Sequence, residues 1–185
     1  MIKKSSKGAM EMSVGTIVTI VLLVSVLVLG LILIKNIFGG ATSAVDLTNQ
    51  QLTDQINQLF SQDTSTQVVI YPQTGQLQIS KGNEGAFGFS IRNTDTVQHT
   101  FSYNVSVIQI ANGCQMSTSQ AQNLIILGGS GSNYVIPSGS SLNQAIPVRF
   151  SIPNSASLCD IRYGLNIDAD GQQYVSTIPL DLQIT

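Results

Sequence analysis

The sequence predicts an α+β protein in which a long N-terminal hydrophobic, transmembrane α-helix precedes an antiparallel, immunoglobulin-like β-sandwich ectodomain. Two patterns carry this prediction. No charged residue occurs between Met12 and Ile34, where Val, Ile and Leu dominate. From Thr66 onward, apolar residues recur at every second position in short stretches separated by turn-forming residues, as in half-buried strands. A chain of 185 residues is long enough for one such domain with an appended helix.

Composition argues against most enzymatic and nucleic-acid-binding functions. Charged residues make up 10% of the chain, less than half the usual share of about 25%. The net charge of -2 gives no basic patch for nucleic acid. One His, two Cys and no Trp leave little material for a metal site or a catalytic triad. We therefore expect a non-enzymatic surface, structural or binding protein, with no cofactor and no nucleic-acid partner.

Charge divides the chain into two unlike parts. Residues 1–40 contain four lysines and one glutamate, whereas residues 41–185 contain four basic and nine acidic side chains. A basic, apolar head on an acidic, polar body predicts that the head inserts into a membrane.

The apolar helix is expected over residues 9–38. Its uncharged stretch of about 23 residues would be about 34 Å long, enough to cross a hydrocarbon core of about 30 Å. More lysines precede the stretch than follow it, so the positive-inside rule predicts a single-pass protein with a cytoplasmic N-terminus and an extracellular domain. A secretory signal peptide has a shorter apolar run of about 7–15 residues, so we expect the helix to be retained. Cleavage near Thr42-Ser43-Ala44 and a buried core helix are the alternatives.

A short basic leader directly precedes the helix. It reads Lys3-Lys4-Ser5-Ser6-Lys7-Gly8 and is followed by Ala9-Met10-Glu11-Met12-Ser13-Val14-Gly15-Thr16-Ile17-Val18. Over about residues 3–38 the chain resembles type IV pilin-like proteins, especially archaeal pilins and archaellins. The resemblance implies that a prepilin peptidase cuts between Gly8 and Ala9 and removes residues 1–8. It also implies a homo-oligomeric filament, assembled through the helix by an assembly ATPase and a platform protein.

Glu11 is the only acidic residue near the proposed cleavage point. It lies three residues after the cut, whereas bacterial pilins usually place a Glu five residues after it, so the archaeal form of the family fits better. A carboxylate in the first turn is favoured by the helix dipole. In a filament it can face the α-amino group of a neighbouring subunit. The alternative is that Glu11 simply lies at the membrane surface beside the lysines.

Residues 39–63 predict an amphipathic stalk helix. Gly39-Gly40 interrupts the apolar run, and Leu52, Ile56, Leu59 and Phe60 then follow at the spacing of one helical face. We expect this helix to extend from near Thr42 to Ser61. Its apolar stripe must pack against a partner or against the chain's own domain.

Residues 64–185 predict the β-sandwich, with a jelly roll or a barrel as alternatives. The turn Pro72-Gln73-Thr74-Gly75 between the first two strands indicates a hairpin, and Pro147 indicates an edge strand. A change of phase at Ile108 and Ile110 predicts a bulge. The segment Leu124-Ile125-Ile126-Leu127 is a buried strand or a helical turn, and residues 128–132 and 138–141 are expected to be flexible loops. About seven strands are expected, over 67–71, 76–79, 87–92, 100–107, 146–152, 159–168 and 178–184.

The two cysteines, Cys114 and Cys159, are expected to form a disulfide if the domain is extracellular. The closed loop contains about 44 intervening residues, for which the loop-entropy model gives roughly 4 kcal/mol. Two free buried thiols are the alternative.

Three further polar features of the sequence can each be interpreted as structural or as functional. Asn104-Val105-Ser106 is an N-glycosylation sequon, and alternation places Asn104 on the solvent face. His99 opens a strand and is expected to be solvated rather than catalytic. Asp168-Ala169-Asp170-Gly171 resembles the opening of a calcium loop but lacks the later ligands. A hairpin turn with Gly at positive φ also explains it.

The leading hypothesis is a structural subunit of an archaeal type IV pilus-like surface filament that serves adhesion or motility. The alternative is a non-polymerising, single-pass membrane-anchored surface protein with an immunoglobulin-like binding domain. An enzyme of the cell envelope is the least favoured hypothesis, because the sequence offers no catalytic constellation.

Overall fold

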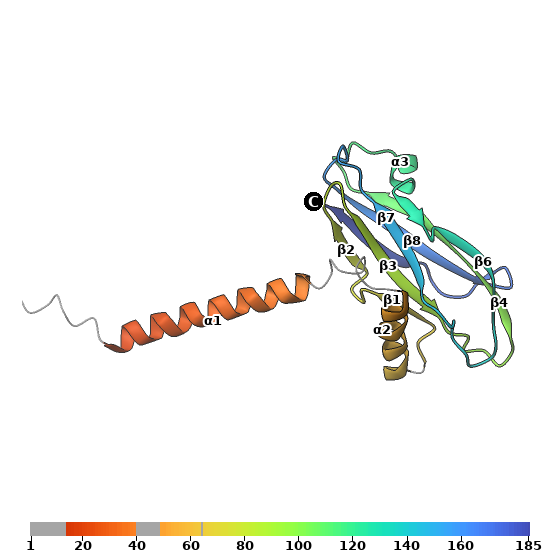
Figure 1. The fold of residues 1–185 in the computed structure, drawn as a ribbon, viewed down its shortest axis with the longest axis horizontal. Coiled ribbons are helices and arrows are strands. Elements are labelled where there is room, and N and C mark those ends of the chain that lie inside the picture. Colours follow the sequence, from red (N-terminus) through yellow and green to blue (C-terminus); the bar gives the residue numbers. More distant parts are fainter. Residues whose placement is uncertain (1–13, 40–48, 64) are drawn as a thin grey trace, which may run out of the picture. The chain divides into compact units, whose positions relative to one another are not determined.

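A computed structural model describes residues 14–39, 49–63 and 65–185 of the chain (Figure 1). The chain divides into two compact units, residues 1–40 and residues 41–185. The first unit contributes one apolar helix, and the second contributes a mostly β domain that carries two helices.

Helix α1 spans Val14–Gly39 as one helix of 26 residues. Its many β-branched residues are poor helix formers in water, but an apolar environment leaves the backbone no alternative to internal hydrogen bonds. Two hydroxyls in the helix also bond to its own backbone: Thr19 Oγ1 donates to the carbonyl of Thr16 over 2.9 Å, and Ser25 Oγ donates to that of Val21 over 2.7 Å. These polar groups are therefore satisfied without water. An apolar N-terminal helix is confirmed.

Helix α2 spans Asn49–Gln62 and packs on the β domain. Leu52, Ile56 and Phe60 are buried in one cluster with Val69 and Ala145. Of the two possibilities for the apolar stripe, packing against the chain's own domain is therefore the one observed. Residues 42–48 of the expected helix lie outside the described residues.

The docking of α2 depends on a small residue in the sheet beneath it. A Cβ atom at Gly88 would lie 2.5 Å from a methyl carbon of Leu52, so any larger residue would force Leu52 to shift. Arg92 then closes the C-terminal end of the helix. Its guanidinium lies 4.4 Å from the centroid of the Phe60 ring and donates to the carbonyls of Phe60 and Asp63 over 3.2 and 3.1 Å.

The β domain consists of two sheets. The four-stranded sheet has the order β1-β3-β7-β5, and the larger sheet has the order β2-β10-β8-β4-β6 with β9 paired to β8. A short helix, α3 (Thr118–Gln122), precedes β5. The strands are β1 Val68–Tyr71, β2 Gln76–Ile79, β3 Glu84–Ile91, β4 His99–Ile110, β5 Ile125–Leu127, β6 Ser130–Ile136, β7 Ile146–Ser151, β8 Cys159–Ala169, β9 Gln172–Gln173 and β10 Ile178–Ile184.

The core lies between the two sheets. Aromatic rings meet across the interface: Phe89 of β3 lies 4.9 Å from Tyr103 of β4, and Phe150 of β7 lies 5.1 Å from Tyr163 of β8, centroid to centroid. These contacts are edge-on, the geometry that aromatic quadrupoles favour. The apolar residues of the alternating stretches therefore face one shared core, as the period of two predicts.

The expected hairpin between the first two strands is wrong. β1 pairs antiparallel with β3 in the smaller sheet, whereas β2 pairs parallel with β10 in the larger one. The turn at Pro72–Gly75, closed by a 2.9 Å bond from the Gly75 amide to the Pro72 carbonyl, instead carries the chain from one sheet to the other. Alternation identifies the buried face of a strand but not its partner. The β2–β10 pair also means that the sheets are not purely antiparallel.

The edge position inferred from Pro147 is wrong as well. β7 lies between β3 and β5. Its pairing with β5 extends only from Phe150 to Arg149, opposite Ile125 and Leu127, so Pro147 lies beyond the end of that ladder. Proline is tolerated inside the sheet here because the neighbouring strand is too short to need its missing amide.

The bulge, the short strands and the tight turn of the β domain agree only in part with the sequence-based expectations. The bulge is confirmed, since the register of β4 against β8 shifts between Val107 and Gln109. The segment at 124–127 forms a strand from Ile125. The expected loop over 128–132 is wrong in part, because β6 begins at Ser130 and pairs with β4 as an edge strand that lacks clear alternation. Asp170 and Gly171, at φ values of 50° and 82°, form the turn between β8 and β9.

Candidate membrane surface and polar sites of the β domain

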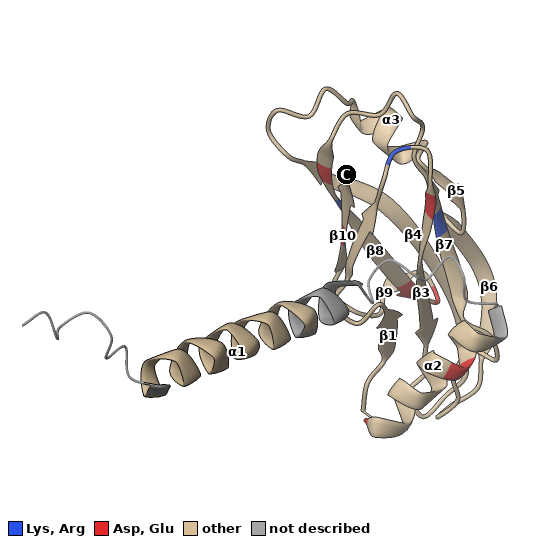
Figure 2. Ribbon diagram, turned by 60° about the vertical axis from the view of Figure 1, so that its left-hand side comes forward, with Lys and Arg blue, Asp and Glu red and all other residues tan. Residues whose placement is uncertain are grey.

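Helix α1 presents apolar side chains around its whole circumference. Every large apolar side chain from Ile17 to Ile32 is between 46% and 69% exposed. The segment Gly15–Ile32 has a mean hydropathy of 2.8 and is long and apolar enough to cross a membrane. From Gly15 to Ile32 the helix carries no charged residue (Figure 2).

The amount of exposed apolar surface shows that α1 requires an apolar environment. Burying one Val, Leu or Ile side chain is worth about 1.5–3 kcal/mol. More than a dozen such side chains therefore represent on the order of 20 kcal/mol, which exceeds the usual stability of a domain of about 5–15 kcal/mol. Water is thus an unfavourable surrounding for α1, whereas lipid or other apolar helices would satisfy it.

The candidate processing and assembly residues at the N-terminus lie outside the described residues. These are Gly8 and Ala9 at the proposed cleavage point and Glu11 in the first turn of the mature helix. They remain predictions from the sequence.

The structure joins Cys114 and Cys159 in a disulfide, with the Cα atoms 5.3 Å apart. Cys114 follows β4 and Cys159 begins β8, so the bond ties the loop beyond β4 to the first residue of β8. Neither cysteine is free. Disulfides persist in oxidising compartments, so the bond suits a domain outside the cytoplasm.

Asn104 lies exposed on β4, opposite Ser130 of β6 and Asn166 of β8. The exposed position agrees with the alternation in the sequence and leaves the side chain accessible to modification. Glycosylation of Asn104 stays a prediction.

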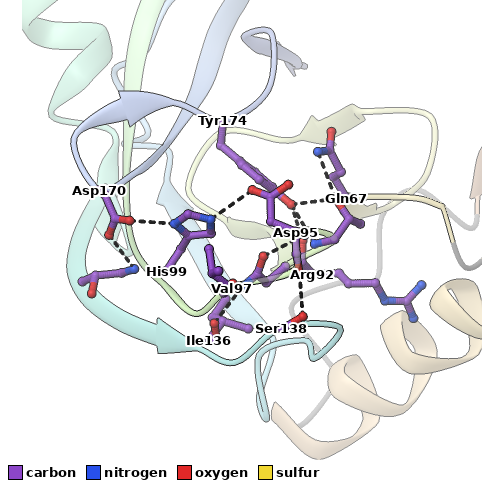
Figure 3. Close-up of polar contacts among 12 residues, drawn as sticks. Gln67, Arg92, Asp95, Val97, His99, Ile136, Ser138, Asp170 and Tyr174 are labelled. Carbon is purple, nitrogen blue, oxygen red and sulfur yellow. Dashed lines mark hydrogen bonds and ion pairs between the residues drawn. The ribbon is translucent and has the colours of Figure 1, made fainter.

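His99 takes part in a polar cluster that the sequence did not reveal (Figure 3). Its Nδ1 lies 2.6 Å from Asp170 Oδ2, and its Nε2 lies 3.1 Å from Asp95 Oδ2. Asp170 Oδ1 also accepts a 2.9 Å hydrogen bond from the Thr100 amide. The only early signal was the i, i+4 spacing of Asp95 and His99. Asp170 comes from a turn 71 residues away in sequence.

The cluster shifts the pKa values of its members. The hydrogen bond to Asp170, opposed by partial desolvation and aided by the charges of both carboxylates, raises the pKa of His99. The hydrogen bonds from His99 and from the Thr100 amide lower the pKa of Asp170. Both shifts favour the charged pair.

Neighbouring contacts indicate that the cluster is structural. The side chain of buried Asn93 donates to the carbonyls of Val97 and Ile136 over 2.8 and 2.9 Å and accepts from the Asp95 amide over 3.0 Å. Ser138 Oγ donates to the Asp95 carbonyl over 2.7 Å. The loop before β4 is thus held to the end of β6 and to the β8–β9 turn. Within the described ranges, no group of three His, Cys, Asp or Glu residues is arranged to hold a metal, and Asp170 is occupied by His99 and Thr100.

The surface of the β domain is hollowed at the larger sheet and beside α3. The sheet hollow, of about 400 Å³, lies over the larger sheet and includes Gln78, Gln183 and the Arg162–Asp181 ion pair, whose N–O distance is 2.7 Å. The loop pocket, of about 300 Å³, lies between residues 115–124, which include α3, and residues 151–157, which follow β7 from its last residue. Its lining consists of Gln115, Met116, Gln120, Asn123, Leu124, Ser151, Pro153, Ser155, Ala156 and Ser157.

No known family model matches the chain, and a search of curated proteins finds no match. Among solved structures, a family 123 glycoside hydrolase from Clostridium perfringens is 11% identical, covers 59% of this chain and 22% of its own, and has a TM-score of 0.40. A Niemann-Pick type C2 protein from the Japanese carpenter ant is 8% identical over 65% of this chain and 90% of its own, at a TM-score of 0.37. A non-cellulosomal cohesin from Archaeoglobus fulgidus is 15% identical over 65% and 92%, at a TM-score of 0.27. Similarities this distant carry no argument about function.

Proposed function

We propose that this chain is a non-enzymatic structural subunit of an archaeal type IV pilus-like surface filament, which serves adhesion or motility. The observation that carries the proposal is the uniform apolar surface of α1, which is exposed on every side from Ile17 to Ile32. A helix that packed on a soluble domain would need only one apolar face. A helix that is surrounded first by lipid and later by identical helices needs apolar residues all round.

The same surface suits both states of such a subunit. Lipid tails and neighbouring apolar helices are equally dry, so transfer of α1 from the bilayer to a filament core would leave its apolar side chains buried. The self-bonded hydroxyls of Thr19 and Ser25 require water in neither state. The filament is therefore a homo-oligomer built through the N-terminal helix.

The sequence before α1 supplies the processing step. The prepilin peptidase would cut between Gly8 and Ala9, release the basic leader and leave the helix on the mature protein. Glu11 then lies near the new α-amino group, where it can pair with that of a neighbouring subunit. An assembly ATPase and a platform protein would drive extraction from the membrane.

The β domain fits the extracellular side of this arrangement. Lysines 3, 4 and 7 favour a cytoplasmic N-terminus, and the Cys114–Cys159 disulfide suits an oxidising compartment. We assign the two-sheet domain to the immunoglobulin-like class, in which two sheets pack over an aromatic and aliphatic core. Exposed Asn104 is available there for glycosylation.

The test begins with mass spectrometry of the native protein. A mature N-terminus at Ala9 and filaments of this chain in electron micrographs of sheared cell surfaces are the expected results. Gly8→Phe should block processing, because the peptidase cuts after a small residue, whereas Ser6→Phe is the matched control and should be processed normally.

Other outcomes would contradict the proposal. A chain that starts at Met1 and forms no filament would be the non-polymerising, membrane-anchored surface protein. A chain cut beyond Gly40 would have lost α1 and would contradict both interpretations.

A further inference from the structure

The loop pocket has the chemistry of a site for an uncharged ligand. None of the described residues that line it is Asp, Glu, Lys, Arg or His. Amides and hydroxyls instead lie beside the apolar side chains of Leu124 and Ala156, both of which are buried. An anionic or cationic ligand would find no counter-charge in this lining.

Several polar side chains of the pocket are free to bind a ligand. Across residues 65–185, the side chains of Gln115, Asn123, Ser155 and Ser157 make no hydrogen bond within the protein. The side chain of Gln120 is the exception, since its Oε1 accepts a 2.8 Å bond from the Ser117 backbone amide, while the Gln120 backbone amide donates to Ser117 Oγ over 3.2 Å. The free amides and hydroxyls can each donate and accept.

The walls of the pocket are fixed in place by covalent and polar links. The disulfide joins Cys114, directly before Gln115, to Cys159, which closely follows Ser157. α3 is held to the core of the β domain by a hydrogen bond in which Tyr163 Oη donates to the Ala121 carbonyl over 2.7 Å. A binding site that is already rigid loses less conformational entropy when a ligand binds.

Hydrogen bonds from α3 and from the last residue of β7 also hold the backbone around the pocket. Gln122 donates to the Val105 carbonyl of β4 over 2.8 Å and accepts from the Val107 amide over 3.1 Å. On the other wall, the Ser151 amide donates to the Leu124 carbonyl over 2.9 Å. The ligand-facing side chains are therefore free while their backbone is held.

We infer that the loop pocket binds a neutral carbohydrate. Sugar hydroxyls both donate and accept hydrogen bonds, which matches the free amides and hydroxyls. The C–H face of a sugar ring can pack on Met116 and Pro153, the accessible apolar residues of the lining. A volume of about 300 Å³ is at the lower end of the range of small-molecule sites, so the pocket takes a short, uncharged glycan segment and not a folded partner.

The location leaves this site accessible. α3 and α2 lie at opposite ends of the β domain in both views (Figures 1 and 2). The pocket beside α3 is therefore remote from the helix through which the chain enters the domain. The inference rests on the β domain alone and holds whether or not the chain polymerises.

The experiment uses the full chain in phosphatidylcholine nanodiscs, which avoids sugar-based detergents. Saturation-transfer NMR is recorded with neutral mono- and disaccharides of glucose, galactose, mannose and N-acetylglucosamine, and with glucuronic acid and glucosamine as charged counterparts. We expect binding of at least one neutral sugar and none of the charged ones. Absence of binding by every neutral sugar, or equal binding of charged counterparts, overturns the inference.

Variants locate the site. Asn123→Ala and Gln115→Ala should each weaken binding about five- to tenfold, the loss of one neutral hydrogen bond, and Ser155→Trp should abolish it by filling the pocket. Gln78→Ala in the sheet hollow is the matched control and should leave binding unchanged. Circular dichroism verifies the fold of each variant. Binding that is lost in Gln78→Ala but kept in Ser155→Trp would place the sugar elsewhere and overturn the inference.

Discussion

Helix α1 and the β domain use apolar residues in opposite ways. In α1 every large apolar side chain from Ile17 to Ile32 is exposed, whereas in the β domain residues such as Phe150 and Leu165 are fully buried. The backbone bonds of α1 are local, and its side chains depend on whatever surrounds it. The β domain supplies its own surroundings through contacts between residues far apart in sequence. The difference teaches that one region is stabilised by its environment and the other by its tertiary fold.

The largest expected effect is in the β domain. Phe150→Ala should lower its free energy of unfolding by about 3–5 kcal/mol, because the ring is completely buried and its removal leaves a cavity between the sheets. Urea unfolding followed by tyrosine fluorescence measures the loss, and membrane association through α1 should not change. Leu127→Ala, at an exposed position, is the control. A comparable loss in both variants would contradict the account of the core.

The converse change affects α1 alone. Leu23→Arg should disfavour membrane insertion by about 2.5–3.5 kcal/mol, the cost of a basic side chain at the centre of a spanning helix. Flotation of expressed protein with vesicles measures the inserted fraction, with Leu23→Ala as the control. Unfolding of the β domain should stay the same. An unchanged inserted fraction would show that α1 does not span the membrane.

The contact between α2 and the sheet gives a smaller effect. Gly88→Val should destabilise the β domain by about 1–3 kcal/mol, because the new side chain overlaps Leu52. In the double variant with Leu52→Ala, the two losses should be less than additive, since the smaller side chain makes room. Strict additivity in the urea unfolding data would mean that α2 does not dock over Gly88.

The smallest effect concerns pH. The pKa of His99 is raised above its ordinary value of 6.5, so its contribution is fully present below about that pH and is lost as the pH rises through the raised pKa. The pKa of Asp170 is lowered below 3.8, so its contribution is lost only as the pH falls through that lowered value. The β domain should therefore lose some stability between pH 5.5 and pH 8.5. Urea unfolding should show a weaker dependence in His99→Gln, and an identical dependence in that variant would contradict the role of the cluster.

Local patterns in the sequence predicted several elements correctly. The apolar run predicted α1, the phase change at Ile108 predicted the bulge of β4, and Asp170-Gly171 has the residue types that a tight turn requires. Each depends on neighbours within a few residues. The packing partner of the Leu52–Ile56–Phe60 stripe could not be predicted in this way. An apolar face shows that a helix packs against something, but it does not identify the surface.

Most of the incorrect predictions concern which strands pair. β1 and β2 are close in sequence but belong to different sheets, and β7 is internal although it contains Pro147. β6 pairs without clear alternation because it is an edge strand with little buried surface. The carboxylates on His99 were missed because one comes from a distant turn. Apart from the i, i+4 spacing of Asp95 and His99, these relations leave no local signal in the sequence.

By itself the sequence determined which segment is an apolar helix and which side of most strands is buried. It also determined the disulfide pairing, because the chain has only two cysteines. Only the tertiary structure decided which strands pair, that α2 lies over Gly88, and that His99 lies between Asp95 and Asp170. The physical reason is the separation in sequence between the residues that interact. Helical bonds and turns join residues a few positions apart, whereas strand pairing and side-chain clusters join residues whose proximity exists only after the chain has folded.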